Sequence, residues 1–329
     1  MDSPELVRCI ETATLAPSLH NSQPWRFRLT GEEIEVYADH DRQLDVLDPD
    51  GRELLVSVGA AVFTLRLALR RAGRIPQLAV LPDPGRPDLV AVIRPGSAAQ
   101  PSAAVLELAD AIERRHTNRQ PFLPKVVPAD AIEELRAAAG HEGAALTIAG
   151  AASRTVIAGL GREAERRLRA RDGYRAEMGR WTRPVAHRRD GVPSAAYGPW
   201  DALERLPMRD FGLVHAPRQR RSEVFEKWPT IAVLTTGADG PADWIRAGQA
   251  LQRVLLVATR RHLATTPISQ PVEIPGIREV LTDRRAGRFA QMVIRLGYGP
   301  PAPATPRRPI AEVLSDRAAS HRAGNGGTP

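Results

Sequence analysis

The chain repeats part of its own sequence, and this repeat limits the folds that it can adopt. Residues 59–71 (GAAVFTLRLALRR) align without gaps on residues 248–260 (GQALQRVLLVATR). Both segments begin with glycine, carry alanine two residues later, and place apolar residues at the spacing of one helix face. Each segment is therefore predicted to form a long helix in the core.

Two weaker matches lie in the same order along the chain. The run DLVAVIRPG at 88–96 matches FAQMVIRLG at 289–297, and the proline-led helix pattern at 4–13 matches the one at 128–139. One such match can arise by chance, but three in one order favour a duplication. We therefore predict an α+β fold built from two degenerate copies that form a pseudo-dimer within one chain. The predicted boundaries are 1–112 for the first copy, 113–320 for the second, and 321–329 for a disordered tail.

The second copy contains a long segment that the first copy lacks, at about residues 172–228. It is rich in proline, glycine and arginine, and it also carries Trp181, Tyr197, Trp200 and Phe211. Because disordered segments are poor in aromatic residues, we expect this one to be ordered. A long irregular segment within a compact domain is typical of a lid over a functional site.

Residues 16–27 (APSLHNSQPWRF) form a rigid polar loop between a predicted helix at 6–15 and a predicted strand at 26–37. Prolines stiffen the loop, and its polar side chains suit a flat, polar aromatic ring. The candidate contacts are Pro17, Ser18, His20, Asn21 and Gln23. Alternatively, these side chains only satisfy the backbone of the loop, and His20 only caps the turn.

A second candidate site is basic. Residues 114–122 (RRHTNRQPF) offer Arg114, Arg115, Thr117 and Arg119, and guanidinium groups bind phosphate oxygens through paired hydrogen bonds. From the residues alone, a solvated basic turn on the surface is an equal alternative.

Both segments closely resemble motifs of the nitroreductase family, namely the loop that binds the flavin ring and the basic opening that holds the phosphate of flavin mononucleotide (FMN). The resemblance implies that the candidates in the loop contact the ring and that the candidates in the basic segment contact the phosphate. Residues 297–314 resemble the closing segment of the family, which implies that Arg307 or Arg308 adds to the phosphate site. The sequence does not choose between these two arginines.

Residues 265–273 (TTPISQPVE) resemble a further loop of the family, whose backbone N–H groups face the reactive ring nitrogen. The resemblance implies contacts from Pro267, Ile268 and Ser269. Ser269 and Gln270 stand where the family commonly has glutamate and glycine. The sequence therefore does not determine the reduction potential of the flavin or whether a substrate can reach it.

The two predicted copies have kept different motifs. The first has the ring loop but no basic opening, and the second has the basic opening but GHEGAAL at 140–146 where the loop would stand. Nitroreductases are usually homodimers with each flavin between the subunits, so the resemblance implies one composite FMN site in a monomeric chain. With its insertion, which contains Asp-Gly-Val-Pro and Arg-Asp-Phe elements, the chain looks like the Acg-type branch of the family.

The resemblance implies an FMN-dependent NAD(P)H oxidoreductase that reduces nitroaromatics, quinones or similar acceptors by ping-pong hydride transfer. One alternative is a protein that sequesters FMN under the lid with little turnover. Another is a cofactor-free protein that binds partners through its basic surface. No catalytic residue is predicted. The sequence does not determine the acceptor, the choice between NADH and NADPH, or whether the lid opens.

Composition disfavours several other classes. The net charge of +8 and the pI near 10.5 suggest nucleic acid, but the positive charge is dispersed among 38 acids and only 5% of residues are aromatic, so we expect no such partner. A single cysteine and eight histidines without ligand spacing predict neither a disulfide nor a metal site. No apolar run reaches the ~18 residues of a membrane span and no export signal is recognisable, so we expect a cytoplasmic protein without membrane contact.

Overall fold

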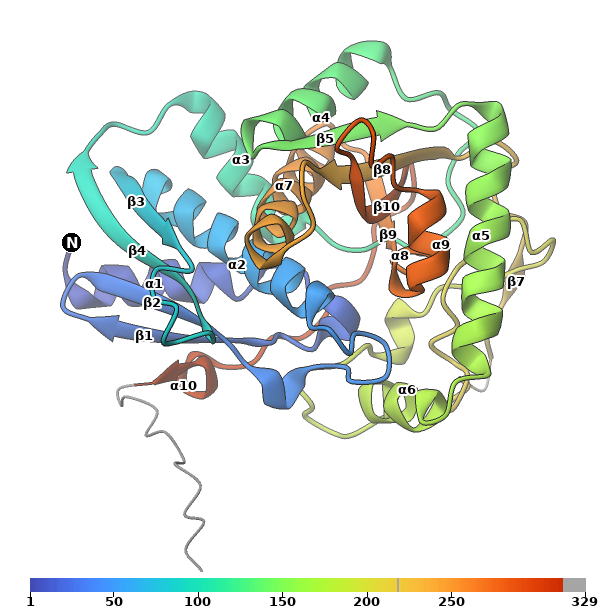
Figure 1. Ribbon diagram of the computed structural model, residues 1–329, viewed down its shortest axis with the longest axis horizontal. Helices are drawn as coiled ribbons and strands as arrows, with labels where there is room; N and C mark the ends of the chain where they lie inside the picture. The colour runs from blue at the N-terminus through green and yellow to red at the C-terminus, as the bar shows by residue number, and fades with distance from the viewer. Residues whose placement is uncertain (218, 316–329) are drawn as a thin grey trace, which may run out of the picture.

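The computed structural model describes residues 1–217 and 219–315, in which two β-sheets flank a pair of long helices (Figure 1). The tail predicted at 321–329 lies outside the described residues. The first part of the chain supplies α1 (Ser3–Ala13), β1 (Trp25–Thr30), β2 (Glu33–Ala38), α2 (Arg52–Arg71), β3 (Arg74–Val80), β4 (Leu89–Ala98) and α3 (Ala103–Arg114).

The second part supplies α4 (Ala129–His141), β5 (Ala144–Ile148), α5 (Ala151–Arg169), α6 (Tyr174–Thr182), β8 (Thr230–Thr236), α7 (Pro241–Arg260), β9 (Ala264–Ile268), α8 (Gln270–Glu273), α9 (Pro275–Val280) and β10 (Phe289–Gly297). The shortest elements are β6 (Trp200–Asp201), β7 (Ser222–Glu223), α10 (Ile310–Val313), β11 (Leu314–Ser315) and the 3-10 turns η1 (Leu19–Asn21), η2 (His40–Arg42) and η3 (Ser194–Ala196). Among the described residues, no helix has the length and apolar character needed to cross a membrane.

The two main sheets have the same order of strands. In the first sheet β1, β2, β4 and β3 follow one another, in the second β5, β8, β10 and β9 do so, and each of these neighbouring pairs is antiparallel. Val90 is an extra, bulged residue in β4, and Gln291 is one in β10. The two bulges occupy equivalent positions in the matched runs 88–96 and 289–297.

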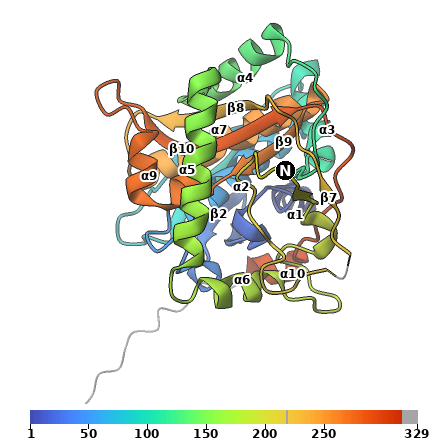
Figure 2. The ribbon, with the colours of Figure 1, turned by 90° about the vertical axis from the view of Figure 1, so that its right-hand side faces the viewer.

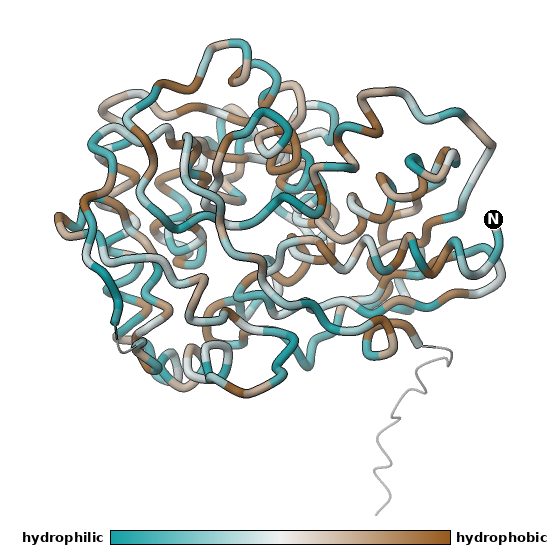
Figure 3. The backbone as a smooth tube through the Cα atoms, turned by 180° about the vertical axis from the view of Figure 1, so that it is seen from behind, coloured by the Kyte–Doolittle hydropathy of each residue, from teal (hydrophilic) through white to brown (hydrophobic). Residues whose placement is uncertain are grey.

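The end of the described chain returns to its beginning. Strand β11 adds to the first sheet beside β1 and parallel to it. The C-terminal segment therefore packs on the N-terminal part of the chain. Apolar and polar residues alternate along the elements (Figure 3), and the buried apolar side chains gather between the sheets and the long helices.

The prediction of a single strand at 26–37 is wrong. Gly31 has a φ of 61°, and the two-residue turn of Gly31 and Glu32 folds the segment into the hairpin of β1 and β2, with Thr30 opposite Glu33. The apolar residues stand at odd-numbered positions in 25–29 and at even-numbered positions in 34–38, so the alternation changes phase at the turn, a signal that the prediction of one strand overlooked.

The helices α2 and α7 cross at two glycines. A Cβ atom on Gly59 would overlap the carbonyl oxygen of Ile245 in α7, and one on Gly248 would overlap the carbonyl oxygen of Val56 in α2. The contact is reciprocal, because each glycine meets the residue three positions before the other glycine. Only glycine fits at this distance, so the spacing of the helices depends on both residues.

Segment 172–228 packs on the side of the molecule that Figure 2 turns toward the viewer, next to α5 and α9. Tyr174, Trp181, Tyr197 and Phe211 are buried in one apolar cluster with side chains from these helices, whereas Trp200 is 44% exposed. The cluster anchors the segment by burying aromatic area.

We predict that Gly248→Ala lowers the free energy of unfolding by about 1 to 3 kcal/mol, because an added methyl group in a filled core forces the backbone to shift. Gly159→Ala is the control, since a Cβ atom at Gly159 within α5 meets nothing within 4 Å. Alanine there should stabilise the helix by roughly 0.5 to 1 kcal/mol. Urea denaturation measures both changes, and an unchanged stability of the Gly248 variant would contradict the close crossing.

Candidate functional site

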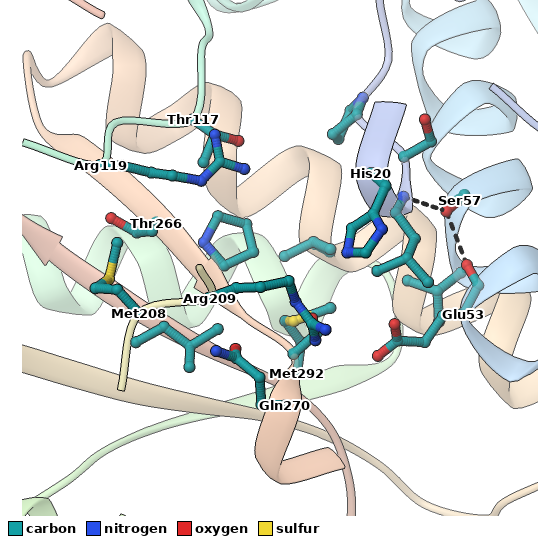
Figure 4. Close-up of a pocket in the computed structure, with 18 of the residues that line it drawn as sticks. His20, Glu53, Ser57, Thr117, Arg119, Met208, Arg209, Thr266, Gln270 and Met292 are labelled. Carbon is teal, nitrogen blue, oxygen red and sulfur yellow. Dashed lines mark hydrogen bonds between the residues drawn. The ribbon is translucent and has the colours of Figure 1, made fainter. Parts of the chain in front are cut away.

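A cavity lies where the loop after α1, helix α2, strand β9 and segment 172–228 meet (Figure 4). The centre of a water-sized sphere can move through a volume of about 90 Å³ in this cavity. One water needs roughly 10–15 Å³ by the same measure, so the cavity is several times larger. Residues predicted from the sequence that line the cavity are Pro17, Ser18, His20, Thr117, Arg119, Pro267, Ile268 and Ser269.

The loop after α1 has a strained backbone. His20, Asn21 and Gln23 have φ values of 48°, 54° and 52°, in the left-handed region that residues other than glycine seldom adopt. Such a conformation persists only where surrounding contacts hold it, and it is frequent at binding sites.

The side chains of Asn21 and Gln23 fasten this loop to distant parts of the chain. Nδ2 of Asn21 donates to the carbonyl oxygen of Gly191 at 3.0 Å. Nε2 of Gln23 donates to the carbonyl oxygen of Arg189 at 2.9 Å, and its Oε1 accepts from the backbone N–H of Arg308 at 2.8 Å. Neither residue lines the cavity, so the structure gives these two predicted ring contacts a supporting role.

His20 lies in the cavity wall, and both ring nitrogens are buried without a hydrogen-bond partner among the residues that the structure describes. Its ring meets the ring of Phe211 edge-on, with 5.1 Å between the centroids. Burial, with added repulsion from Arg209 and Arg119, holds the pKa of His20 well below its ordinary value. The ring is therefore neutral at neutral pH, with one donor and one acceptor that are both unpaired.

Ser18 and the end of β9 present further polar groups. The Oγ of Ser18 accepts from the backbone N–H of Gln23 at 2.9 Å, and a hydroxyl that accepts one bond can still donate its own proton. The Oγ of Ser269 accepts from Nη2 of Arg209 at 3.4 Å. The cavity thus has polar groups on two sides. Pro267 and Ile268 line it next to Ser269 on the second side.

Within the described part of the chain, Arg115, Arg119 and Arg307, like the exposed Arg114, have no acidic partner. Arg115 is buried, and Arg115 and Arg307 both donate through Nη2 to the carbonyl oxygen of Leu15, at 3.5 and 3.2 Å. Their Nε atoms are buried without a partner. Arg119 donates to the carbonyl oxygen of Ala196 at 2.8 Å. Burial lowers the pKa of Arg115 to about 9 and the pKa values of Arg119 and Arg307 to about 10.

Other buried arginines of this protein are paired with carboxylates. Nη2 of Arg209 lies 2.6 Å from Oε1 of Glu273, and Nη2 of Arg295 lies 2.6 Å from Oε2 of Glu226. Moving a charge out of water costs several kcal/mol unless a partner compensates. The arginines without a carboxylate therefore predict a bound anion, and the guanidinium fork suits phosphate.

The two remaining predicted arginines have other contacts. Arg114 is exposed at the end of α3, where its Nε donates to the carbonyl oxygen of Asp110 in the same helix at 3.2 Å. Nε of Arg308 lies 3.3 Å from Oε2 of Glu312. The structure thus does not bring Arg114 to the cluster, and Arg307, not Arg308, shares an acceptor with Arg115.

Part of the lining was missed from the sequence. Glu53 and Ser57 reach the cavity from α2, and Met208, Arg209 and Phe211 reach it from segment 172–228. The Arg-Asp-Phe element was a signal for Arg209 and Phe211. Glu53 lies in the first turn of a helix, where an acid is ordinary, so no sequence signal separated it from a helix-stabilising residue.

The sequence is similar to known proteins over almost its whole length. The model of the nitroreductase family matches residues 112–298. The Mycobacterium tuberculosis protein named "Putative NAD(P)H nitroreductase Rv3131" is 33% identical over 319 residues, which cover 94% of this chain and 91% of that protein. "Putative NAD(P)H nitroreductase acg" from the same species is 32% identical over 321 residues, which cover 95% and 96%.

Solved structures are similar at lower identity. The FMN-dependent nitroreductase NfnB from Mycobacterium smegmatis, in complex with NADPH, matches with a TM-score of 0.37 and 17% identity. The match covers 64% of this chain and 100% of that chain.

We predict opposite effects on stability for two buried arginines in the ligand-free protein. Arg115→Met removes a charge without a carboxylate partner and should raise the free energy of unfolding by about 1 kcal/mol, whereas Arg209→Met leaves Glu273 unpaired and should lower it by about 3 to 5 kcal/mol. Urea denaturation of ligand-free protein measures both. Destabilisation of similar size in the two variants would mean that the Arg115 guanidinium is compensated by the fold itself.

Proposed function

We propose that this protein is an FMN-dependent oxidoreductase that uses NAD(P)H. The chain belongs to the nitroreductase family. The names of the two relatives contain the words NAD(P)H nitroreductase. For this chain, the observation that carries the proposal is the group of arginines without carboxylate partners next to a polar cavity. FMN matches this arrangement, since it joins a flat polar ring to a phosphate.

The residues present fit the phosphate of FMN. The proposed ligands are Arg115, Thr117, Arg119 and Arg307. The buried Nε atoms of Arg115 and Arg307 support this assignment, because buried polar atoms without a partner in the protein are expected to meet a ligand. Arg114 and Arg308 are not included, because of the contacts described above.

The residues present also fit the ring. The proposed contacts are Pro17, Ser18 and His20 on one side and Pro267, Ile268 and Ser269 on the other. The unpaired nitrogens of His20 support this placement, and Asn21 and Gln23 hold the loop in the conformation that presents them. When bound, FMN supplies the acceptance and donation of a hydride.

Segment 172–228 is proposed to act as a lid that excludes water from this reaction. Pro207, Met208, Arg209 and Phe211 line the cavity from this segment. Two contacts support a closed position. Nε2 of Gln270 donates to the carbonyl oxygen of Pro207 at 2.9 Å, and Arg209 pairs with Glu273.

We further propose that the chain is a fused pseudo-dimer with one composite site. The repeated strand order, the bulges at matched positions and the reciprocal glycine contact support a duplication. The boundary between 1–112 and 113–320 would fall inside α3, near its C-terminal end. Ring contacts from residues 17–20 and phosphate contacts from residues 115–119 would then come from different copies, and the chain would act as a monomer.

The proposed acceptors are nitroaromatics, quinones or similar molecules, reduced after NAD(P)H in a ping-pong sequence. FMN storage with little turnover is the second candidate function. The observation that favours it is that the proposed lid lines the cavity and is held there by the buried ion pair of Arg209 and Glu273. The two functions differ in whether the cover helps or hinders the reaction of NAD(P)H.

We predict that Arg115→Met weakens FMN binding by about 1.5 to 3 kcal/mol, the range for hydrogen bonds to a charged group. Riboflavin, which has no phosphate, should bind the variant and the wild type alike. Fluorescence titration of ligand-free protein measures both affinities. Equal losses for FMN and riboflavin would point to general damage of the site, and no loss for FMN would place the phosphate elsewhere.

Phe211→Ala separates catalysis from storage. If the cover builds the substrate pocket, as we propose, removing this ring lowers NAD(P)H oxidation with a quinone by about tenfold or more. If the cover only sequesters the cofactor, the rate rises instead. Trp200→Ala is the matched control, because Trp200 belongs to the same segment but does not line the cavity, and its rate should equal that of the wild type.

A further inference from the structure

Glu53 stands in the wall between two hollows of the molecule. It lines the inner cavity next to Ser57, and it also lines a surface pocket together with Asp48, Asp50 and Glu279. Asp50 and Glu279 are exposed, so this second pocket is open to water. Figure 4 shows the carboxyl group of Glu53 directed toward the middle of the inner cavity.

Within the described residues 1–217 and 219–315, only one carboxyl oxygen of Glu53 has a hydrogen-bond partner. Oε1 accepts from Nη2 of Arg52 at 2.7 Å, whereas Oε2 is buried without a partner. Arg52 holds the side chain through Oε1, so Oε2 is available to bind another group. A protonated carboxyl group can donate from such an oxygen.

The charges around Glu53 favour a bound proton. Its neighbours are the cations Arg52 and Arg209 and the acids Asp48 and Glu273. Three carboxyl groups thus share two guanidinium groups. Burial, together with the charge of Glu273, raises the pKa of Glu53 well above its ordinary value.

The covered cavity makes such a group useful. Segment 172–228 closes one side of the cavity, and the loop after α1 closes another. A reaction that consumes protons there needs a side chain that carries them in from water. Glu53 is the carboxyl group that the inner cavity and the surface pocket have in common.

We propose that Glu53 is the proton donor of the cavity and is recharged from the surface pocket. The proposal rests on the proposed oxidoreductase function. Reduction of a quinone adds a hydride, drawn from NAD(P)H, and one proton, which leaves Oε2 of Glu53 for a quinone oxygen and completes the hydroquinone. The carboxylate that remains next to Arg52 takes up a proton from water in the surface pocket.

The test compares two acceptors in the FMN-loaded protein. Glu53→Gln keeps the shape of the side chain but removes its acidic proton. After reduction with NAD(P)H, mixing with a quinone should show re-oxidation slowed by about 100-fold, the scale of general acid catalysis. Ferricyanide takes up electrons without protons, so its reaction should be unchanged. Glu279→Gln, at the rim of the surface pocket, is the control and should react like the wild type with both acceptors.

A second measurement does not depend on turnover. The infrared spectrum of the wild type at neutral pH should contain a carbonyl band of a protonated carboxylic acid that Glu53→Gln lacks. A wild type without this band, or a variant that re-oxidises with quinone as fast as the wild type, would overturn the proposal. Failure of the proposed function would look different, because the wild type itself would then react with neither acceptor.

Discussion

The crossing of α2 and α7 is the contact on which the rest of the structure depends. At Gly59 and Gly248 the helices meet backbone to backbone, and this close approach brings the elements attached to each helix together around one cavity. The loop after α1 is tied to α2, since the backbone N–H of Leu19 donates to Oγ of Ser57 at 3.1 Å. Strand β9 follows α7 and forms the facing wall of the cavity. A wider spacing of the helices would separate the walls of the cavity. The cavity therefore depends on the glycines at positions 59 and 248, which have no side chain.

Several unfavourable features of the protein lie in or next to the wall of this cavity. Three residues of the loop after α1 have left-handed backbones. In the part of the chain that the structure describes, the ring nitrogens of His20 are buried without hydrogen bonds and Arg115 is buried without a carboxylate partner. Each lowers the stability of the ligand-free protein. A single ligand with a polar ring and a phosphate would offer partners to the ring of His20 and the guanidinium group of Arg115. Elsewhere, buried charges such as Arg295 are paired, which argues that the exceptions serve binding.

The sequence predicted those parts of the structure that local patterns encode. The long helices followed from apolar periodicity, the contact between Gly59 and Gly248 agrees with their alignment, and the basic run with Arg115 stood out by composition. It could not predict which polar side chains support the site and which line it, because that depends on partners far along the chain. Asn21 is held by Gly191, 170 residues away. Gly31 is a different case, because the alternation of apolar residues changes phase across this turn and the prediction of one continuous strand overlooked that local signal.

We propose that one chain holds one flavin between its two halves. The most direct measurement is light scattering after gel filtration of the FMN-loaded protein, combined with fluorescence of the flavin that denaturation releases from the same fractions. We predict particles with the mass of one chain, 35.9 kDa, each carrying one FMN. Two flavins per chain, or flavin found only in particles of twice this mass that separate on unfolding alone, would contradict it.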